Sequence, residues 1–441
     1  MKSVICICFL WVALFSCGKE PETGVKSVGA VDFLNSMGAV SSVSRRGERL
    51  EETIECIKYT GLRWLRVGYE DDAPVGDFIE VHKQTGIRFS YGLLSGHSDI
   101  RRLIAESKQL AAAGALLALE GLNEPNNWGI TYNDEEGGGQ QNKSWLPVAG
   151  IQRDLYAAVK NDPELKNYPV WSLSENGAQT DNAGLQFLTI PQGAGALMPD
   201  GTKYADYANC HNYIVHPAWP GLHDNQTWRS ADPGPDCPVD GLYGNYGLTW
   251  NKKFQGYAND ELLTLPRVTT ETGYAVSPQE GVDEEMQARL YVNLYLSQFK
   301  RGWSHTAIYL LKGRSNEPEH ESFALYTLDG KPKQAARYIH NLTGILADDK
   351  PVKEPGRFDY AIPDQPATVH DLLLQKSNGN FMLVIWGERF GSGGTDEIVV
   401  HTGEKYKSAK IYDITAGISP VRETKSKSIA LSLTNYPVIV E

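Results

Sequence analysis

The chain has 441 residues, which is room for one large domain and a smaller one. Hydrophobic residues make up 41% and aromatic residues 10%, enough for a sizeable core and too many for a disordered chain. Its 54 acidic residues exceed its 42 lysines and arginines, and the formal net charge is −12. This balance argues against a nucleic-acid-binding protein, which needs a concentrated basic surface.

The first residues are typical of an export signal. Met1-Lys2 is followed by an uncharged apolar run from Val4 to Phe15, which has the length of a signal-peptide core and is too short to span a membrane. The run ends in Leu14-Phe15-Ser16-Cys17, which resembles a bacterial lipobox. We therefore expect residues 1–16 to be a lipoprotein signal peptide, Cys17 to carry the lipid and residues 17–29 to be a tether. The pattern predicts an exported lipoprotein of the bacterial outer membrane, attached by its lipid alone.

Three cysteines lie beyond this segment, and they are Cys56, Cys210 and Cys237. Their spacing does not match a zinc site. In an oxidising compartment Cys210 and Cys237 could form a disulfide, and the alternative is three unpaired, mostly buried thiols. We predict neither a metal nor a cofactor.

After the tether, strand-like runs alternate with stretches of helical spacing. The eight predicted strands are Val31–Leu34, Trp64–Val67, Phe89–Leu93, Leu116–Leu119, Val170–Leu173, Tyr207–Cys210, Arg267–Thr270 and Ala307–Leu310. Apolar residues recur every three or four positions between them, and this spacing predicts helices. Predicted helices begin near Leu50 and Ile100, ending at Gly61 and Gly114, and cover Leu146–Val159, Glu284–Phe299 and Gln334–Leu346. Eight such units favour a (β/α)₈ TIM barrel over residues 30–348.

The pattern changes at about Asp349. Strand-like runs are separated by turn residues from there on, and they are Phe381–Trp386, Ile398–Val400, Ala409–Tyr412 and Val438–Val440. We expect residues 349–441 to form a small antiparallel β-sandwich packed on the barrel. The predicted fold class is therefore α/β, a TIM barrel with a C-terminal sandwich.

Two of the predicted strands run into a glutamate. Strand four leads into Asn123-Glu124-Pro125, and strand seven leads into Glu271. In a barrel of this type the carboxyl ends of the strands face the active site. A carboxylate next to a buried strand is costly unless another group pairs with it or uses it. Two such glutamates on strands four and seven favour catalysis over two unrelated helix caps or salt bridges.

These residues resemble those of a known group of enzymes. Asn123-Glu124-Pro125 and the strand-end Glu271 are similar to the acid/base and the nucleophile of clan A retaining glycoside hydrolases, which are TIM barrels with catalytic glutamates on strands four and seven. The resemblance extends to His211-Asn212-Tyr213 after strand six and to Arg66 on strand two. It implies that Tyr213 and Arg66 orient the nucleophile. It further implies that Asn123 contacts the sugar 2-hydroxyl and that His211 lies near the glycone.

The chemistry explains the need for two carboxylates. Retaining hydrolysis uses one as nucleophile and the other as acid and then base, about 5–5.5 Å apart. The charge on Glu271, held by Arg66, would keep Glu124 protonated near neutral pH. Trp128, four residues after Glu124, is expected to stack on a sugar ring. The resemblance predicts cleavage of β-glycosidic bonds in a poly- or oligosaccharide, with this carbohydrate as the partner.

The chain departs from the clan at strand eight. Many members have a Trp there that floors the subsite where the bond breaks, whereas this chain has Tyr309-Leu310-Leu311-Lys312. The barrel with its appended sandwich is most similar to family 39, with family 5 next, and lipid-anchored members are similar to enzymes of polysaccharide-degrading Bacteroidetes. One alternative is a catalytically inactive, glycan-binding barrel. Another is a metal-dependent barrel hydrolase, although the histidine clusters that such sites use are missing from the sequence.

Overall fold

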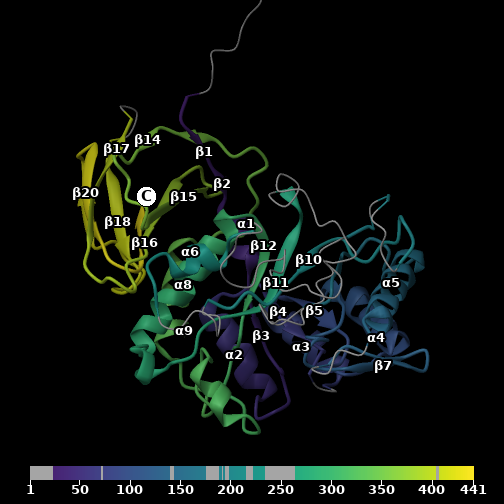
Figure 1. Cartoon of the computed structure of the whole chain (residues 1–441). Helices are drawn as coiled ribbons and strands as arrows, with labels where there is room; N and C mark the ends of the chain where they lie inside the picture. The colour runs from purple at the N-terminus through teal and green to yellow at the C-terminus, as the bar shows by residue number, and fades with distance from the viewer. Residues whose placement is uncertain are drawn as a thin grey trace, which may run out of the picture.

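The computed structural model describes residues 23–70, 73–139, 144–174, 188–190, 192–193, 198–214, 222–233, 264–403 and 407–441. Eight parallel strands form one sheet in the order β10-β11-β12-β3-β4-β5-β6-β9. Their bounds are β3 Met37–Val40, β4 Trp64–Val67, β5 Arg88–Gly92, β6 Leu116–Glu120, β9 Val170–Trp171, β10 Ala208–Asn209, β11 Arg267–Thr272 and β12 Trp303–Ile308. A parallel bridge between Trp171 and Tyr207 links the two ends of this sheet. The predicted (β/α)₈ barrel is confirmed (Figure 1).

Helices surround the strands close to the predicted positions. They are α1 Ala30–Ser36, α2 Leu50–Thr60, α3 Val75–Thr85, α4 Ile100–Ala112, α5 Leu146–Asn161, α6 Gln226–Ser230, α8 Glu284–Lys300 and α9 Gln334–Ile345, with short 3₁₀ helices at Pro278–Glu280 and Pro318–Ser322. Gly61 ends α2 in the left-handed conformation, with φ of 71°, as a helix-terminal glycine typically does. Helix α3 was not predicted. Across the described ranges, no helix is both long and apolar enough to cross a membrane.

The first predicted strand is wrong. Val31–Leu34 lies in α1, and the first strand of the barrel is β3. Phe33, Leu34 and Ala30 are buried together at helical spacing, and a short apolar run of this kind cannot be told from a strand by periodicity alone. Gly38 lets β3 pass against Trp64, because a Cβ on Gly38 would lie 2.3 Å from the indole ring.

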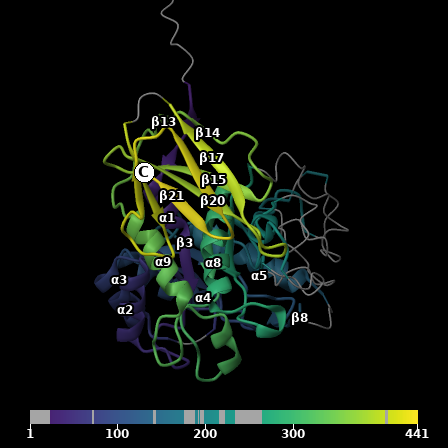
Figure 2. The same cartoon turned by 90° about the vertical axis from the view of Figure 1, so that its left-hand side faces the viewer.

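The C-terminal residues form the predicted antiparallel sandwich. One sheet has the order β19-β18-β21-β16-β15-β2, in which β2 is Val28–Gly29, and the other has the order β14-β17-β20. The strands are β13 Arg357–Phe358, β14 Tyr360–Ala361, β15 Val369–Gln375, β16 Phe381–Gly387, β17 Asp396–Thr402, β18 Ala409–Asp413, β19 Arg422–Thr424, β20 Ser428–Leu433 and β21 Pro437–Val440. The inner faces of both sheets contribute to one cluster of buried apolar side chains. Figures 1 and 2 show the C-terminal strands of these sheets, coloured from green to yellow, beside the barrel.

The N-terminal part of the described chain also belongs to the sandwich. Strand β1 (Val25–Lys26) pairs with β13, and β2 (Val28–Gly29) pairs in parallel with β15. Residues 25–29 fall within the predicted tether of residues 17–29, and in the structure they pair with strands of the sandwich. Two-residue strands carry too little periodicity to be found in the sequence, and they form here because β13 and the edge of β15 offer them backbone partners.

The barrel and the sandwich share a continuous hydrophobic core. Glu388, which follows β16, is buried there and accepts hydrogen bonds from the backbone N–H groups of Thr227 at 3.0 Å and Trp228 at 3.3 Å. Ser297 of α8 donates to the same carboxylate at 3.2 Å. Burial raises the pKa of Glu388 to about 7. The sandwich thus fixes α6, which lies between β10 and β11 along the chain.

Candidate active site

The carboxyl ends of four barrel strands bring the predicted site residues together. Arg66 comes from β4, Glu271 from β11, Asn123 and Glu124 follow β6, and His211 and Tyr213 follow β10. All six are linked by the hydrogen bonds and ion pairs described below. The site therefore lies at the carboxyl ends of the barrel strands, where the active sites of TIM-barrel enzymes are found.

Glu271 is held by three donors. Its Oε1 accepts from Nη1 of Arg66 at 2.6 Å and from the hydroxyl of Tyr69 at 2.7 Å. Its Oε2 accepts from the hydroxyl of Tyr213 at 3.0 Å. Burial raises the pKa of Glu271, while His211 and Arg66 act in the opposite direction. The donors therefore stabilise the charged carboxylate at a site where burial disfavours it.

Glu124 leaves the barrel in an uncommon backbone conformation, with φ of 41°. Its N–H donates to the carbonyl of Ser174, and its own carbonyl accepts from the N–H groups of Asn127 and Trp128, each at 2.8 Å. Its Oε2 accepts from Nδ2 of Asn127 at 2.9 Å, and its Oε1 lies 2.7 Å from Nδ1 of His211. Burial raises the pKa of the Glu124 carboxyl. Backbone held this way by its surroundings is typical of functional positions.

The two carboxylates are close neighbours. One oxygen of Glu124, one oxygen of Glu271 and a ring nitrogen of His211 all lie within 4.8 Å of one another. Among the described residues these three side chains are the one group that could share a metal ion. The guanidinium of Arg66, 2.6 Å from Glu271, would repel a second positive charge there. The arrangement is better suited to proton transfer and nucleophilic attack than to holding a cation.

Arg66 has a second anionic partner that sequence reasoning missed. Glu120, at the end of β6, accepts from Nη2 of Arg66 at 2.6 Å and from Nε at 3.0 Å, and both side chains are fully buried. Ser90 and Thr270 donate to the same carboxylate at 3.0 Å and 2.9 Å. The signal for Glu120 was available, because it is an acidic residue directly at the end of a buried strand.

Tyr69 was also missed. It follows Arg66 by three residues at the same strand end, and its ring lies over the guanidinium with the centroid 3.7 Å from Cζ. Its hydroxyl bond to Glu271 adds to the support that was expected from Arg66 and Tyr213. The sequence held a signal for Tyr69, because this tyrosine directly follows Gly68 at the end of the strand that carries Arg66.

Asn123 and Trp128 flank Glu124 in the chain. Oδ1 of Asn123 accepts from Nη2 of Arg66 at 2.8 Å, and its Nδ2 donates to Ser95 at 3.1 Å. Trp128 lies in the turn after Glu124 and is 53% exposed. Asn123 is thus fixed within the polar network, while the indole of Trp128 has a free surface for stacking.

Three more tryptophans, Trp219, Trp228 and Trp250, follow the predicted sixth strand and are weaker candidates for sugar stacking. Trp228 stacks on His370 of the sandwich, with ring centroids 4.1 Å apart, so its face is used within the protein. Trp219 and Trp250 lie outside the described residues. Cys237 does too, so the structure gives no outcome for its pairing with Cys210, which is buried.

At strand eight, a tyrosine stands where many clan members have a tryptophan. Tyr309 directly follows β12 and is 7% exposed. Its hydroxyl accepts from Nη1 of Arg314 at 3.1 Å and lies 2.9 Å from Nδ1 of His320. Arg314 is itself buried and donates to Glu70 at 2.7 Å. A charged network thus fixes the Tyr309 ring.

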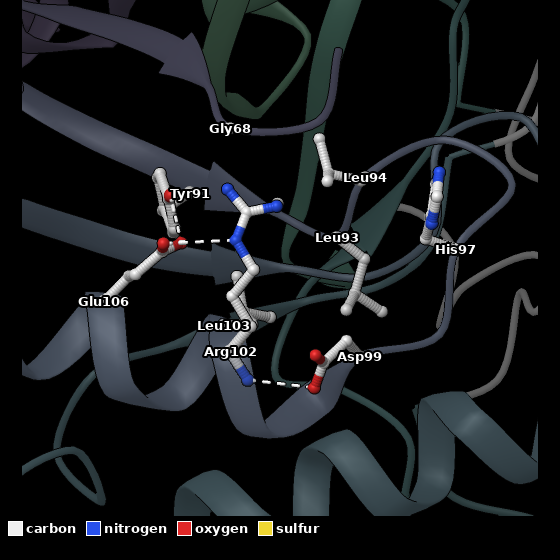
Figure 3. Close-up of a pocket in the computed structure, with 10 residues that line it drawn as sticks. Gly68, Tyr91, Leu93, Leu94, His97, Asp99, Arg102, Leu103 and Glu106 are labelled. Atoms are coloured by element: carbon white, nitrogen blue, oxygen red, sulfur yellow. Dashed lines mark hydrogen bonds and ion pairs between the residues drawn. The ribbon is translucent and has the colours of Figure 1, made fainter. Parts of the chain in front are cut away.

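A separate cavity of about 170 Å³ lies at the ends of β4 and β5 and the start of α4 (Figure 3). Arg102 and Glu106 form an ion pair at 3.1 Å on its wall. Leu94 also lines it, and the next residue, Ser95, accepts from Asn123 and donates to the carbonyl of Tyr69. The cavity therefore borders the residues that support the carboxylates without containing the carboxylates themselves.

We expect Arg66→Met to destabilise the protein by about 3–5 kcal/mol, because it leaves Glu120 buried without its cation. Urea unfolding of both proteins measures the difference. The control is Arg153→Met, since Arg153 pairs with Asp154 at the surface, where an ion pair contributes at most about 1 kcal/mol. Equal stability of the two variants would contradict this account of the buried pair.

Comparisons with solved structures support the fold. The chain is similar to a family 39 glycoside hydrolase from Bacteroides cellulosilyticus WH2, with a TM-score of 0.58 and 13% identity over 94% of this chain and 82% of that one. It is similar to a GH51 arabinofuranosidase from Xanthomonas axonopodis pv. citri, with a TM-score of 0.54 and 11% identity over 95% and 97% of the chains. It is also similar to a monomeric β-xylosidase from Caulobacter crescentus CB15, with a TM-score of 0.51 and 14% identity over 94% of this chain and 97% of that one.

No family model and no curated protein sequence matches this chain. At identities of 11–14%, the structural similarity establishes a shared fold and leaves the activity to be argued from the site. The protein therefore has the TIM-barrel fold of clan A glycoside hydrolases, including families 39 and 51.

Proposed function

We propose that this protein is a retaining glycoside hydrolase that cleaves β-glycosidic bonds of a poly- or oligosaccharide, with Glu271 as nucleophile and Glu124 as acid/base. The observation that carries the proposal is the difference between two buried, neighbouring carboxylates. Glu271 is surrounded by an arginine and two tyrosine hydroxyls, whereas Glu124 faces an imidazole and an amide. Neighbouring carboxyls in such different environments are suited to opposite protonation states.

The reaction proceeds in two displacements. Glu271 attacks the anomeric carbon while Glu124 gives its proton to the departing oxygen, so that a glycosyl ester forms as the glycosidic bond breaks. Water then replaces the ester, and Glu124 takes the proton of the attacking water. One oxygen of Glu124 lies within 4.8 Å of one oxygen of Glu271, which is compatible with the separation of about 5–5.5 Å between the carboxyl groups of retaining enzymes.

The surroundings of Glu124 suggest how the sugar is held. The exposed indole of Trp128 offers a flat apolar face beside the proposed acid, and such faces stack on sugar rings. Two of the similar structures are described as a β-xylosidase and an arabinofuranosidase. We therefore propose plant-type polysaccharides and their oligosaccharides as the first substrates to test.

The test is a panel of plant and microbial polysaccharides and aryl glycosides, assayed for released sugar with products separated by size. The panel is run on wild type, on Glu271→Gln and on Glu397→Gln, which changes an exposed glutamate of β17. Release by wild type and Glu397→Gln, but not by Glu271→Gln, supports the proposal. Binding of a glycan with no release by any protein would instead indicate the glycan-binding alternative.

We also propose that the protein is an exported lipoprotein of the outer membrane, anchored through Cys17. The support is the apolar run that ends in Leu14-Phe15-Ser16-Cys17. A radiolabelled fatty acid is expected to enter the wild-type protein made in a bacterial host and not Cys17→Ala. Equal labelling of the two proteins would refute the lipid anchor and would leave the proposed enzymatic activity unaffected.

A further inference from the structure

A chain of hydrogen bonds runs from Glu124 into the interior of the barrel. Nδ1 of His211 lies 2.7 Å from Oε1 of Glu124, and Nε2 of the same ring lies 3.1 Å from Oγ1 of Thr270. The Thr270 hydroxyl donates to Oε1 of Glu120 at 2.9 Å. His211, Thr270 and Glu120 are fully buried, so these bonds are not exchanged for water.

The direction of the bonds follows from the groups at the inner end. Glu120 is paired with Arg66, and an ionised carboxylate can only accept. The single hydroxyl proton of Thr270 is therefore directed to Glu120, and the Thr270 oxygen presents a lone pair to His211. Asn209 lies beside the same hydroxyl, with its Nδ2 donating to the Thr270 oxygen at 3.0 Å and its Oδ1 at 3.2 Å. A hydroxyl oxygen has two lone pairs, so one remains for the His211 ring.

We propose that Thr270 is a positioning residue that fixes the neutral His211 ring with its proton on Nε2, so that Nδ1 only accepts and the proton shared with Glu124 resides on Glu124. This inference rests on the proposed function and deepens it, because it assigns what holds the general acid in its protonated form. Two lone pairs 2.7 Å apart repel each other, and a proton on the Glu124 carboxyl turns this contact into a hydrogen bond.

The same arrangement serves both displacements. In the first, the proton of Glu124 passes to the departing oxygen, and Glu124 is left as an anion facing the Nδ1 lone pair. That contact disfavours the anion. In the second displacement Glu124 regains a proton from water, which restores the hydrogen bond to His211. His211 gains and loses no proton in this cycle, so it acts by orientation alone.

The charges around His211 and Glu124 agree with a neutral ring. Burial lowers the pKa of His211 to about 4. The charged or titratable groups that act on the two side chains are Arg66, Glu70, Glu120, Tyr213 and Glu271. Glu271 is the nearest to the ring, with Oε2 3.6 Å from Nδ1, and it takes its hydrogen bonds from Arg66, Tyr69 and Tyr213.

The first test is the tautomer itself. Nitrogen-15 NMR of the histidine-labelled protein, with the His211 signals identified from their loss in His211→Gln, distinguishes a proton on Nε2 from one on Nδ1. We expect the Nε2–H form in wild type and in Thr270→Ser, which keeps the hydroxyl. Thr270→Val removes the lone pair, and we expect it to shift the ring toward Nδ1–H. A wild-type ring with its proton on Nδ1 overturns the inference.

The second test is the pH profile of kcat/KM. In Thr270→Val an Nδ1–H group can donate to ionised Glu124, so the alkaline limb is expected about one unit lower than in wild type. Thr270→Ser should keep the wild-type limb. The control Thr269→Val should also keep the wild-type limb, because the hydroxyl that it removes donates to the backbone carbonyl of Glu271. An unmoved limb in folded Thr270→Val, or an equal shift in Thr269→Val, overturns the positioning role.

The two proposals fail separately. The NMR result needs no turnover, so a wild type that cleaves no glycoside would refute the proposed function while the tautomer assignment is judged on its own. If Thr270→Val does not fold, the wild-type and Thr270→Ser spectra still decide the assignment.

Discussion

Glu271→Gln is expected to lower kcat/KM by at least about four orders of magnitude on every substrate that wild type cleaves. The amide is a very poor nucleophile, so the covalent step is lost whatever the leaving group. The change is nearly isosteric, and the Gln oxygen can still accept from Arg66 and Tyr69, while the amide NH2 takes the place of the oxygen that faces Tyr213. The rate is measured by single-turnover and steady-state assays on the best substrate from the panel.

The control for this variant is another buried carboxylate. Glu388→Gln changes a fully buried glutamate between barrel and sandwich and is expected to keep the wild-type specific activity. Thermal unfolding of each variant separates loss of fold from loss of chemistry. If folded Glu271→Gln keeps the wild-type rate, Glu271 is a partner of Arg66 only, and the nucleophile must be sought elsewhere.

Glu124→Ala is expected to respond differently. Loss of acid assistance should slow cleavage of poor leaving groups by about 10²–10⁴-fold, while activated aryl glycosides still form the glycosyl enzyme. Added azide should then speed turnover, because it needs no general base, and a β-glycoside substrate should yield a β-glycosyl azide. The product is identified by NMR and mass spectrometry.

The paired experiment is azide with Glu271→Ala, which lacks the attacking carboxylate. It should give no β-glycosyl azide, since that product requires a glycosyl enzyme of inverted configuration. If the two alanine variants respond alike, or if azide rescues neither, then the division of roles between Glu124 and Glu271 is wrong.

Much of the barrel was predictable because each βα unit has a local signature. Helix α2 shows this, with apolar residues on one face and a glycine at its end. The misplaced first strand had no such signature, since Val31–Leu34 is too short for its period to separate helix from strand. Strands β1 and β2 depend on partners more than 300 residues away, and local sequence does not encode such pairing.

The outer members of the candidate site were predictable from the sequence. Of the inner members, Glu120 had a signal in its position at a strand end, but the contacts that the inner residues make had none. Glu124, Glu271 and Arg66 follow a motif at strand ends, and the structure places them together. Glu120 and Thr270 act through side-chain packing inside the barrel, which depends on strand register. Arg66 pairs with Ser90, and Gly92 with Glu120, so the inward residues share neighbouring layers. This register depends on how neighbouring strands pair in the barrel, so the sequence of a single strand does not predict it.

The central claim is a double displacement at Glu271, and the anomeric configuration of the first-formed product tests it most directly. Proton NMR during the first minutes of hydrolysis, before mutarotation, records which anomer appears. Two displacements predict a β-product from a β-glycoside. An α-product would show a single displacement by water, and Glu271 could then be a base but not the nucleophile.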